Sequence, residues 1–294
     1  MKASQISLCA LAGGATAISF APILVRLSEV GPTATAFWRL TLALPLLWFY
    51  KTFEGYKTPQ IKKPSSLTSH LKLLIPGLFF AGDLSIWHRS IGWTSVANAT
   101  LLVNFAPIFV TICSRLIFNY RFTKTFIFGM ILALLGASVL VKVSFNLNIQ
   151  YFLGDALALS AALFYAGYLI SVKELRRQYS TATIMSWAGL SCCITLFIIS
   201  TLTRENLIVY SLRGWLVLLG LALISHIGGQ GLIVYALAHL PAAFSSVALI
   251  LQPMIATMLA WVILKESMTL GQSLGCAIVL FGIFMARVGS ELPD

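Results

Sequence analysis

Apolar segments of about twenty residues alternate with short polar segments along the whole chain. Ten such segments span residues 4–26, 32–50, 71–91, 95–117, 124–142, 151–172, 181–202, 213–238, 242–264 and 269–287. Each could cross a hydrocarbon core ~30 Å thick as a helix, and the alternation expected of barrel strands is absent. Because only helices and closed barrels satisfy their own backbone in lipid, the pattern predicts an all-α integral membrane protein with ten transmembrane helices.

The glycines and prolines of the two halves coincide when the sequence is shifted against itself. A shift of 146 residues superimposes Gly82, Pro107, Gly129 and Gly136 on Gly228, Pro253, Gly275 and Gly282. Since both residue types constrain the backbone, the coincidence predicts two five-helix repeats, 1–142 and 143–294, within one integral membrane unit. An odd number of spans inverts the second repeat, which is typical of secondary transporters.

The composition favours the membrane and excludes several soluble classes. The chain is 59% hydrophobic and 10% charged, with a mean hydropathy of +0.90, whereas a soluble domain carries ~25% charged residues. Ten spans leave no room for a separate soluble enzyme domain. The net charge of +11 is scattered over short loops, so nucleic acid is not an expected partner. The expected partners are the lipid bilayer and a small-molecule substrate.

The basic residues predict how the helices are oriented. With the N-terminus in the cytoplasm, the inner side holds Lys2, Lys51, Lys57, Lys62, Lys63, Lys72, Arg115, Arg121, Lys124, Lys173, Arg176, Arg177 and Arg287. The outer side holds Arg26, Lys142, Arg204, Arg213 and Lys265. Because cytoplasmic loops carry the excess of Lys and Arg, both termini are predicted in the cytoplasm, in a multi-pass protein of the cytoplasmic (inner) membrane.

The cysteines carry no sign of a metal centre. All five lie inside apolar segments, at Cys9, Cys113, Cys192, Cys193 and Cys276. No two have the C-x-x-C spacing of metal or redox sites, so they are interpreted as small buried hydrophobic residues. No metal, disulfide framework or cofactor is expected.

Ionisable side chains inside apolar segments are costly, which makes each of them a candidate for function. Asp83 lies near the middle of the third segment, and Trp87 follows one helical turn later on the same stripe. Asp83 is predicted to take part in proton coupling, and Trp87 to contact substrate. A structural hydrogen bond between helices is the alternative role for Asp83.

The eighth segment places His226 and Gln230 one turn apart, around Gly228 and Gly229. The glycines weaken the helix and are predicted to act as a hinge. His226 is a candidate for substrate binding and coupling, and Gln230 and the following Tyr235 for substrate binding. The alternative for His226 is a packed histidine with satisfied hydrogen bonds.

The fourth and ninth segments each contain a central proline, Pro107 and Pro253. Proline bends a helix and frees a carbonyl, so both residues are predicted hinges beside a central cavity. The amides Asn98, Asn104 and Gln252 lie in the same segments and are predicted to bind substrate. Hydrogen bonds between helices are the alternative role for these amides.

Two further features are predicted to be structural. Gly275 and Gly282, with Gly129 and Gly136 at the matching positions, form small-residue faces that bring helices close together. Packing within the bundle is favoured, and a homodimer through these faces of helices five and ten is the alternative. Arg39, in the second segment, is predicted to snorkel to the outer surface, with an anionic substrate group as its alternative partner.

Several stretches carry a resemblance to a known family. They are residues 20–26, 31–32, 36–39, 95–100, 106–107, 154–155 and the run from 252 to 282. Through them the chain resembles the EamA-type, ten-helix members of the drug/metabolite transporter superfamily. The resemblance implies two inverted five-helix repeats around a central cavity, and transport of small metabolites, amino acids prominent among them. Members often carry an acid after helices four and nine, whereas this chain has Tyr120 and Glu266 there.

The residues and the resemblance together favour a secondary transporter. It would move a small organic metabolite, an amino acid or a related compound, by alternating access. Proton coupling and export are further expectations. One alternative is a lipid flippase or passive facilitator on the same scaffold. The other is a membrane-embedded enzyme, which would need acids or histidines clustered at one membrane face.

Overall fold

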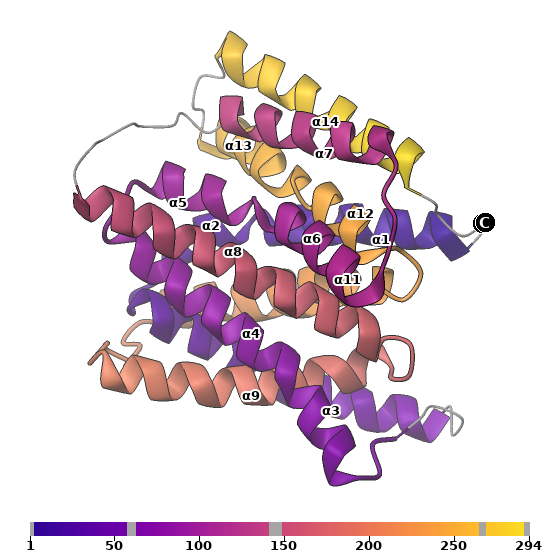
Figure 1. Cartoon of the computed structure of the whole chain (residues 1–294). Helices are drawn as coiled ribbons and strands as arrows, with labels where there is room; N and C mark the ends of the chain where they lie inside the picture. The colour runs from indigo at the N-terminus through magenta and orange to yellow at the C-terminus, as the bar shows by residue number, and fades with distance from the viewer. Residues whose placement is uncertain (1–2, 58–62, 141–148, 265–268, 291–294) are drawn as a thin grey trace.

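The computed structural model describes residues 3–57, 63–140, 149–264 and 269–290, and every regular element in these ranges is helical (Figure 1). The first half contains α1 (Ala3–Ile18), α2 (Ala21–Arg26), α3 (Pro32–Lys57), α4 (Leu67–Ile91), α5 (Val96–Val103), α6 (Ala106–Phe118) and α7 (Lys124–Leu140). The second contains α8 (Ile149–Leu175), α9 (Thr181–Leu202), α10 (Leu212–Gly220), the π-helical η1 (Leu221–Gln230), α11 (Gly231–Ala236), α12 (Ala242–Ala248), α13 (Leu251–Leu264) and α14 (Leu270–Gly289). The predicted all-α class is confirmed for these residues, whereas the predicted repeat boundary at 142 lies outside them.

Seven helical segments of the described chain are long and apolar enough to cross a membrane. They are Ser4–Arg26, Asn98–Phe118, Ile149–Leu175, Thr181–Leu202, Leu212–Ala236, Ala242–Leu259 and Leu270–Gly289. The apolar helix α7 is shorter, and α3 and α4, over two further predicted segments, are not among the seven. The arrangement is that of a multi-pass integral membrane protein, and a ten-span count would need these three helices as well.

Three of the predicted segments contain a break in place of one continuous helix, at α1–α2, α5–α6 and α12–α13. A fourth, α10–η1–α11, is continuous but changes to a π-helix over η1. Pro22 and Pro107 lie in the first turns of α2 and α6, and Pro253 is the third residue of α13. Proline lacks the N–H that a helix interior needs but is accepted in a first turn, so the chain stops one helix before each proline and starts another.

The helix α3 is longer than its apolar pattern predicts. The predicted boundary at residue 50 is wrong, because α3 continues through polar residues to Lys57. An apolar run marks the thickness of the hydrocarbon, whereas a helix can continue beyond it into water. The next helix, α4, starts where the Ser66 hydroxyl accepts a hydrogen bond of 3.2 Å from the Ser69 N–H.

The helices α7 and α14 lie side by side along their length at one edge of the bundle (Figure 1). Glycine makes the close approach possible. A Cβ on Gly136 would lie 2.7 Å from the Val279 nitrogen, and one on Gly275 would lie 3.0 Å from the Gly136 oxygen. A Cβ on Gly282 would collide with the backbone of Ala133. These glycine faces are occupied within one chain, so the predicted homodimer would need another face.

The two described ends of the chain lie at one end of the bundle, called the termini end below. Near the start of α1, Ser7 Oγ is 3.1 Å from His239 Nδ1 in the loop before α12. At the end of α14, the Gly289 carbonyl accepts a hydrogen bond of 2.7 Å from Thr123 Oγ1. His239 and Gly289 also line one cavity, which places both chain ends together.

The opposite end, called the far end, is held by loops from the two halves of the chain. Ala34 N–H donates to Glu205 Oε2 at 2.9 Å, and the Glu29 carboxylate accepts hydrogen bonds from the hydroxyl and the N–H of Ser211. The Ser211 hydroxyl lowers the pKa of the Glu29 carboxyl below its ordinary value, because the hydrogen bond favours the charged form. The carboxylates of α2–α3 and α9–α10 loops therefore fasten this end.

Candidate functional site

A cavity of about 220 Å³ lies between the middle of the bundle and the far end. Its walls come from the α1–α2, α5–α6 and α12–α13 breaks, the first turns of α3, the second half of α4, and from α8 and η1. A single ordered water needs only ~10–15 Å³, so this space can hold a small organic molecule. It is called the central cavity below.

Opposite charges face the central cavity without pairing. Arg39 on α3 and Asp83 on α4 both line it, and each side chain is 7% exposed. Among the described residues no ion pair joins them, Asp83 has no hydrogen bond, and Arg39 Nε has no partner. Burying charge without a partner is expensive, so the arrangement favours a ligand that supplies both an anion and a cation.

Further polar groups on the same walls have no partner in the described part of the chain. They are Trp87 Nε1, His88 Nδ1 and Gln252 Nε2. Buried donors are usually satisfied by protein or by water, so several orphaned groups on one cavity indicate a place for water or a polar ligand. Trp87 and His88 come from α4, and Gln252 comes from the α12–α13 break.

An aromatic wall closes one side of the central cavity. Phe80 and Tyr165 line it, and Tyr168 lies behind them, with ring centroids 4.9 Å from Phe80 and 5.9 Å from Tyr165. The Tyr168 hydroxyl accepts a hydrogen bond of 2.9 Å from Gln230 Nε2, which fixes the amide beside the cavity. Apolar rings next to orphaned polar groups suit an amphipathic ligand.

The helix breaks meet at the cavity. Asn104 follows α5, and its Nδ2 donates to the Thr100 carbonyl at 2.8 Å. At the α1–α2 break, Ser19 Oγ donates to the Gln252 carbonyl at 3.1 Å, which links it to the α12–α13 break. Backbone groups left free by broken helices are tolerated at this depth only beside protein or a wet cavity.

The family of this protein is identified by comparing its sequence with models of known families. A model of the EamA-like transporter family matches the chain twice, over residues 5–142 and 152–288. The chain belongs to the EamA-like transporter family. The resemblance inferred from its motifs is thereby confirmed.

Curated relatives of this EamA-like protein are transporters. The pseudopaline exporter CntI of Pseudomonas aeruginosa is 26% identical over 167 residues, 57% of each chain. An uncharacterized transporter of Archaeoglobus fulgidus is 28% identical over 221 residues, 72% of this chain and 77% of its own. The chain thus matches little more than half the length of the exporter. A solved crystal structure, 16% identical, covers 99% of each chain with a TM-score of 0.78 and shares the fold.

The structure brings five of the predicted residues of this EamA-like transporter to the central cavity. Trp87, Asn104, Gln230 and Gln252 line it as candidate substrate contacts, and Asp83 as the candidate coupling group. The predicted hinge Pro107 and its counterpart Pro253 also line it, directly beside the helix breaks.

Other predicted residues lie away from the cavity. His226 is buried in η1 behind Phe80, with ring centroids 6.1 Å apart, and neither ring nitrogen has a partner among the described residues. Asn98 is buried in the first turn of α5, where its N–H donates to Ser95 Oγ. Tyr235 is 37% exposed on α11 near His239, toward the termini end.

The predicted glycine hinge lies in η1, a π-helical stretch of ten residues. A Cβ on Gly229 would lie 2.6 Å from Ile18 Cγ1, and one on Gly14 would lie 2.8 Å from the Gly229 oxygen. Gly229 therefore permits the close approach of α1 to η1. Gly228 is open apart from the Leu223 carbonyl at 3.3 Å.

Sequence reasoning gave no role to the cavity residues His88 and Tyr165 of this EamA-like chain, and it gave Arg39 a substrate contact only as its alternative role. The snorkelling predicted for Arg39 is wrong, because α3 packs against α9 and η1 and turns this side chain inward. An arginine inside an apolar segment was the available signal. The sequence around Tyr165 carries no such signal, since the direction of this side chain depends on how α8 packs.

Proposed function

We propose that this protein is a secondary transporter for a small metabolite that carries both an anionic and a cationic group, an amino acid or a related compound. The single observation that carries the proposal is the unpaired Arg39 and Asp83 on one cavity. Arg39 offers planar N–H groups that match a carboxylate, and Asp83 accepts from an ammonium group. The aromatic wall takes the apolar part of the molecule.

The mechanism proposed is alternating access between two inverted five-helix repeats, residues 1–142 and 143–294. Two matches of one family model to the two halves support a duplicated architecture. Ten spans follow if α3, α4 and α7 cross together with the seven apolar segments. The excess of Lys and Arg at the termini end supports a cytoplasmic location for it, in the inner membrane.

Export coupled to protons is the form of transport that we propose. One curated relative is named as an exporter, which supports this direction. Asp83 would carry the proton, and the predicted partner His226 lies one aromatic ring away from the cavity. Titration of Asp83 in the empty cavity would then compete with the cationic group of the substrate.

The binding test is thermal stabilisation of purified protein by single amino acids. A ligand at a hundred times its Kd stabilises by about 2.7 kcal/mol. We expect Arg39→Gln and Asp83→Asn each to abolish the shift that the wild type shows. Arg26→Gln, which removes an exposed charge at the far end, is the matched control. Equal shifts in wild type and Arg39→Gln would refute the charged site.

The transport test uses proteoliposomes loaded with the amino acid that gave a shift. An imposed proton gradient should accelerate transport by the wild type and leave transport by an Asp83→Asn, His226→Ala double variant unchanged. Gradient-driven transport by the double variant at the wild-type rate would remove the coupling assignment. Transport by the wild type that ignores the gradient would favour the passive facilitator.

A further inference from the structure

A second cavity, of about 290 Å³, lies at the termini end, on the other side of the bundle's middle from the central cavity. Its walls are the ends of α6, α8 and α14, the α6–α7 loop with the start of α7, and the loop that leads into α12 with the first residues of α12. Its ionisable lining residues are Tyr120, Arg121, Lys173, Glu174 and His239. It is called the termini-end cavity below.

The two cavities lie on the same helices, one beyond the other. On α8, Tyr165 lines the central cavity and Lys173 lines the termini-end cavity, ~12 Å farther along at 1.5 Å per residue. On α12, Ser246 lines the first and Phe244 the second, and α6 contributes to both. The two cavities therefore lie one beyond the other along the same helices.

The helices α6 and α12, which line both cavities, pack against each other. Apolar side chains buried on these helices are Val110 and Val247, at 0% exposure, and Phe244, at 2%. The same helices also bury hydroxyl groups, at Thr111, Ser114, Ser245 and Ser246. The corresponding segments toward the far end, α5 and α13, pack less extensively against each other and flank the central cavity. The barrier in this structure is thus on the termini side of the central cavity.

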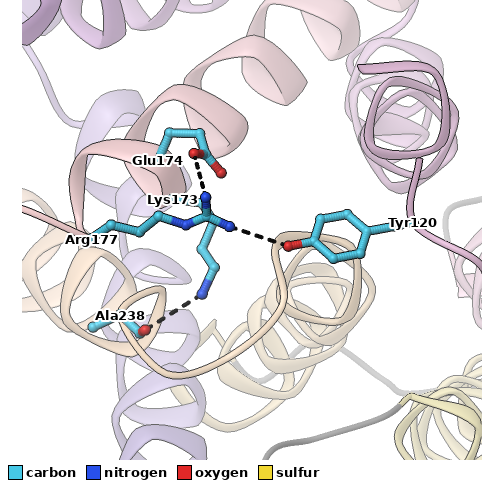
Figure 2. A network of polar contacts seen from close by, with 5 residues as sticks. All are labelled: Tyr120, Lys173, Glu174, Arg177 and Ala238. Carbon is cyan, nitrogen blue, oxygen red and sulfur yellow. Dashed lines mark hydrogen bonds and ion pairs between the residues drawn. The ribbon is translucent and has the colours of Figure 1, made fainter. Parts of the chain in front are cut away.

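The lining of the termini-end cavity has an excess of positive charge, from Arg121 and Lys173, and Figure 2 shows the surroundings of Lys173. Arg177 Nη1 pairs with Glu174 Oε2 at 3.1 Å, and Arg177 Nη2 donates to the Tyr120 hydroxyl at 3.3 Å. Lys173 Nζ points away from this pair and reaches only the Ala238 carbonyl, at 3.4 Å. Since Arg177 compensates Glu174, the positive charge of Lys173 has no acidic partner among the described residues.

We propose that the termini-end cavity is a second binding site, for the carboxylate of the transported metabolite, with Lys173 as the contacting cation. Separation of α6 from α12 then joins this site to the central cavity, where Arg39 receives the same carboxylate. The proposal rests on the proposed function for the identity of the ligand. The long side chain of Lys173 can follow a carboxylate because its ammonium has a single weak hydrogen bond to leave.

The test measures charge selectivity with cysteine reporters and needs no transport. Ser114 and Ser290 line the termini-end cavity, and Ser246 lines the central one. Each is changed to Cys in a chain whose five native cysteines are replaced by serine or alanine. The proteins, in neutral phosphatidylcholine vesicles, react with an anionic sulfonate or a cationic trimethylammonium methanethiosulfonate.

We expect Ser114→Cys and Ser290→Cys to react from the side of the termini, and Ser246→Cys from the other side only. Relative to free cysteine, Ser114→Cys should favour the anionic reagent roughly five- to tenfold. In an Arg121→Gln background, which removes the other cation of the lining, Lys173→Gln should remove that preference. Lys124→Gln, which deletes an exposed charge at the same end outside the cavity, should leave it unchanged.

Sodium succinate is the carboxylate probe, compared with sodium chloride at equal ionic strength. It should slow the modification of Ser114→Cys at least twofold, and do so only with Lys173 present. An anionic preference that survives Lys173→Gln in the Arg121→Gln background, or no slowing by succinate, would overturn the proposal. Slowing by added phosphatidylglycerol but not by succinate would assign the cavity to a lipid headgroup instead. If these results hold but no amino acid is bound or transported, the proposed function fails alone.

Discussion

Two pairs of helices in this protein meet in opposite ways. The α7–α14 pair is unbroken and packs backbone against backbone, through glycines on both helices. The α6–α12 pair is built from the short pieces of broken helices, and it packs through side chains between two cavities. Backbone contact over several turns cannot rearrange without unpacking, whereas a short side-chain contact can. The first pair is suited to be a fixed frame and the second to be a moving barrier.

The largest expected effect is on the frame. Gly282→Leu places a side chain where a Cβ already collides with Ala133, so we expect a loss of roughly 3 kcal/mol or more and little folded protein. Gly271→Leu is the matched control on the same helix, because its nearest neighbour would be 4.0 Å from the new Cβ. Thermal melting and size-exclusion profiles in detergent measure both. A normal Gly282→Leu profile would contradict the frame.

The next effect is on the barrier, in rate and not in stability. Pro253→Ala restores an N–H at the α12–α13 break and should straighten the helix there. We expect transport about tenfold slower, about 1.4 kcal/mol in the barrier, with a melting temperature at or above that of the wild type. Pro45→Ala, exposed within the unbroken α3, is the control. If both variants transport equally fast, the break is not a hinge.

A smaller effect tests how the breaks are joined. Ser19→Ala removes a hydroxyl that is shared between the Ala15 carbonyl, at 2.7 Å, and the Gln252 carbonyl, at 3.1 Å, and should cost about 1 kcal/mol in stability. Because the bond to Gln252 crosses between two breaks, the transport rate should also change severalfold. Ser90→Ala removes a buried hydroxyl that bonds only within α4, to Trp87, and should change stability alone. Identical transport rates for the two variants would mean that the breaks move independently.

The smallest effect concerns the far end. Hydrogen bonds from Ser211 lower the pKa of Glu29, so Glu29 stabilises the fold above its unfolded pKa. That contribution is lost as the pH falls through the lower folded value. The wild type should therefore melt slightly above Glu29→Gln at pH 7, and the difference should vanish near pH 3. An unchanged difference at both pH values would show that the carboxylate does not act through its charge.

The sequence predicted what depends on local pattern. Apolar runs located the helices, and Pro107 and Pro253 located two of the breaks, because a missing N–H acts within one turn. The spacing of Gly275 and Gly282 predicted a close helix contact, since a missing Cβ matters wherever helices touch. Asp83 lines the central cavity, as predicted, because a carboxylate in an apolar segment is costly unless it faces protein or a cavity.

What the sequence could not give is the direction in which a side chain points. Arg39 faces the cavity only because α9 and η1 cover its helix, and Tyr235 leaves the cavity because α11 lies toward the termini end. The helical spacing predicted that His226 faces the cavity, whereas in the structure it packs against Phe80, which lines the central cavity. These side-chain directions depend on packing between segments that are distant in the sequence, and the pattern of one helix does not determine that packing. Glu266, the acid whose counterpart in the first half is Tyr120, lies outside the described residues.

The helix α12 has seven residues and forms a wall of both cavities. A compact apolar molecule that fitted beside Phe244 in the termini-end cavity would hold this wall in place. It would do so without touching Arg39 or Asp83. Such a molecule would act as a non-competitive inhibitor, lowering the maximal transport rate while leaving the affinity of the central cavity unchanged. The shared wall thus offers a place to stop the protein that raising the substrate concentration could not overcome.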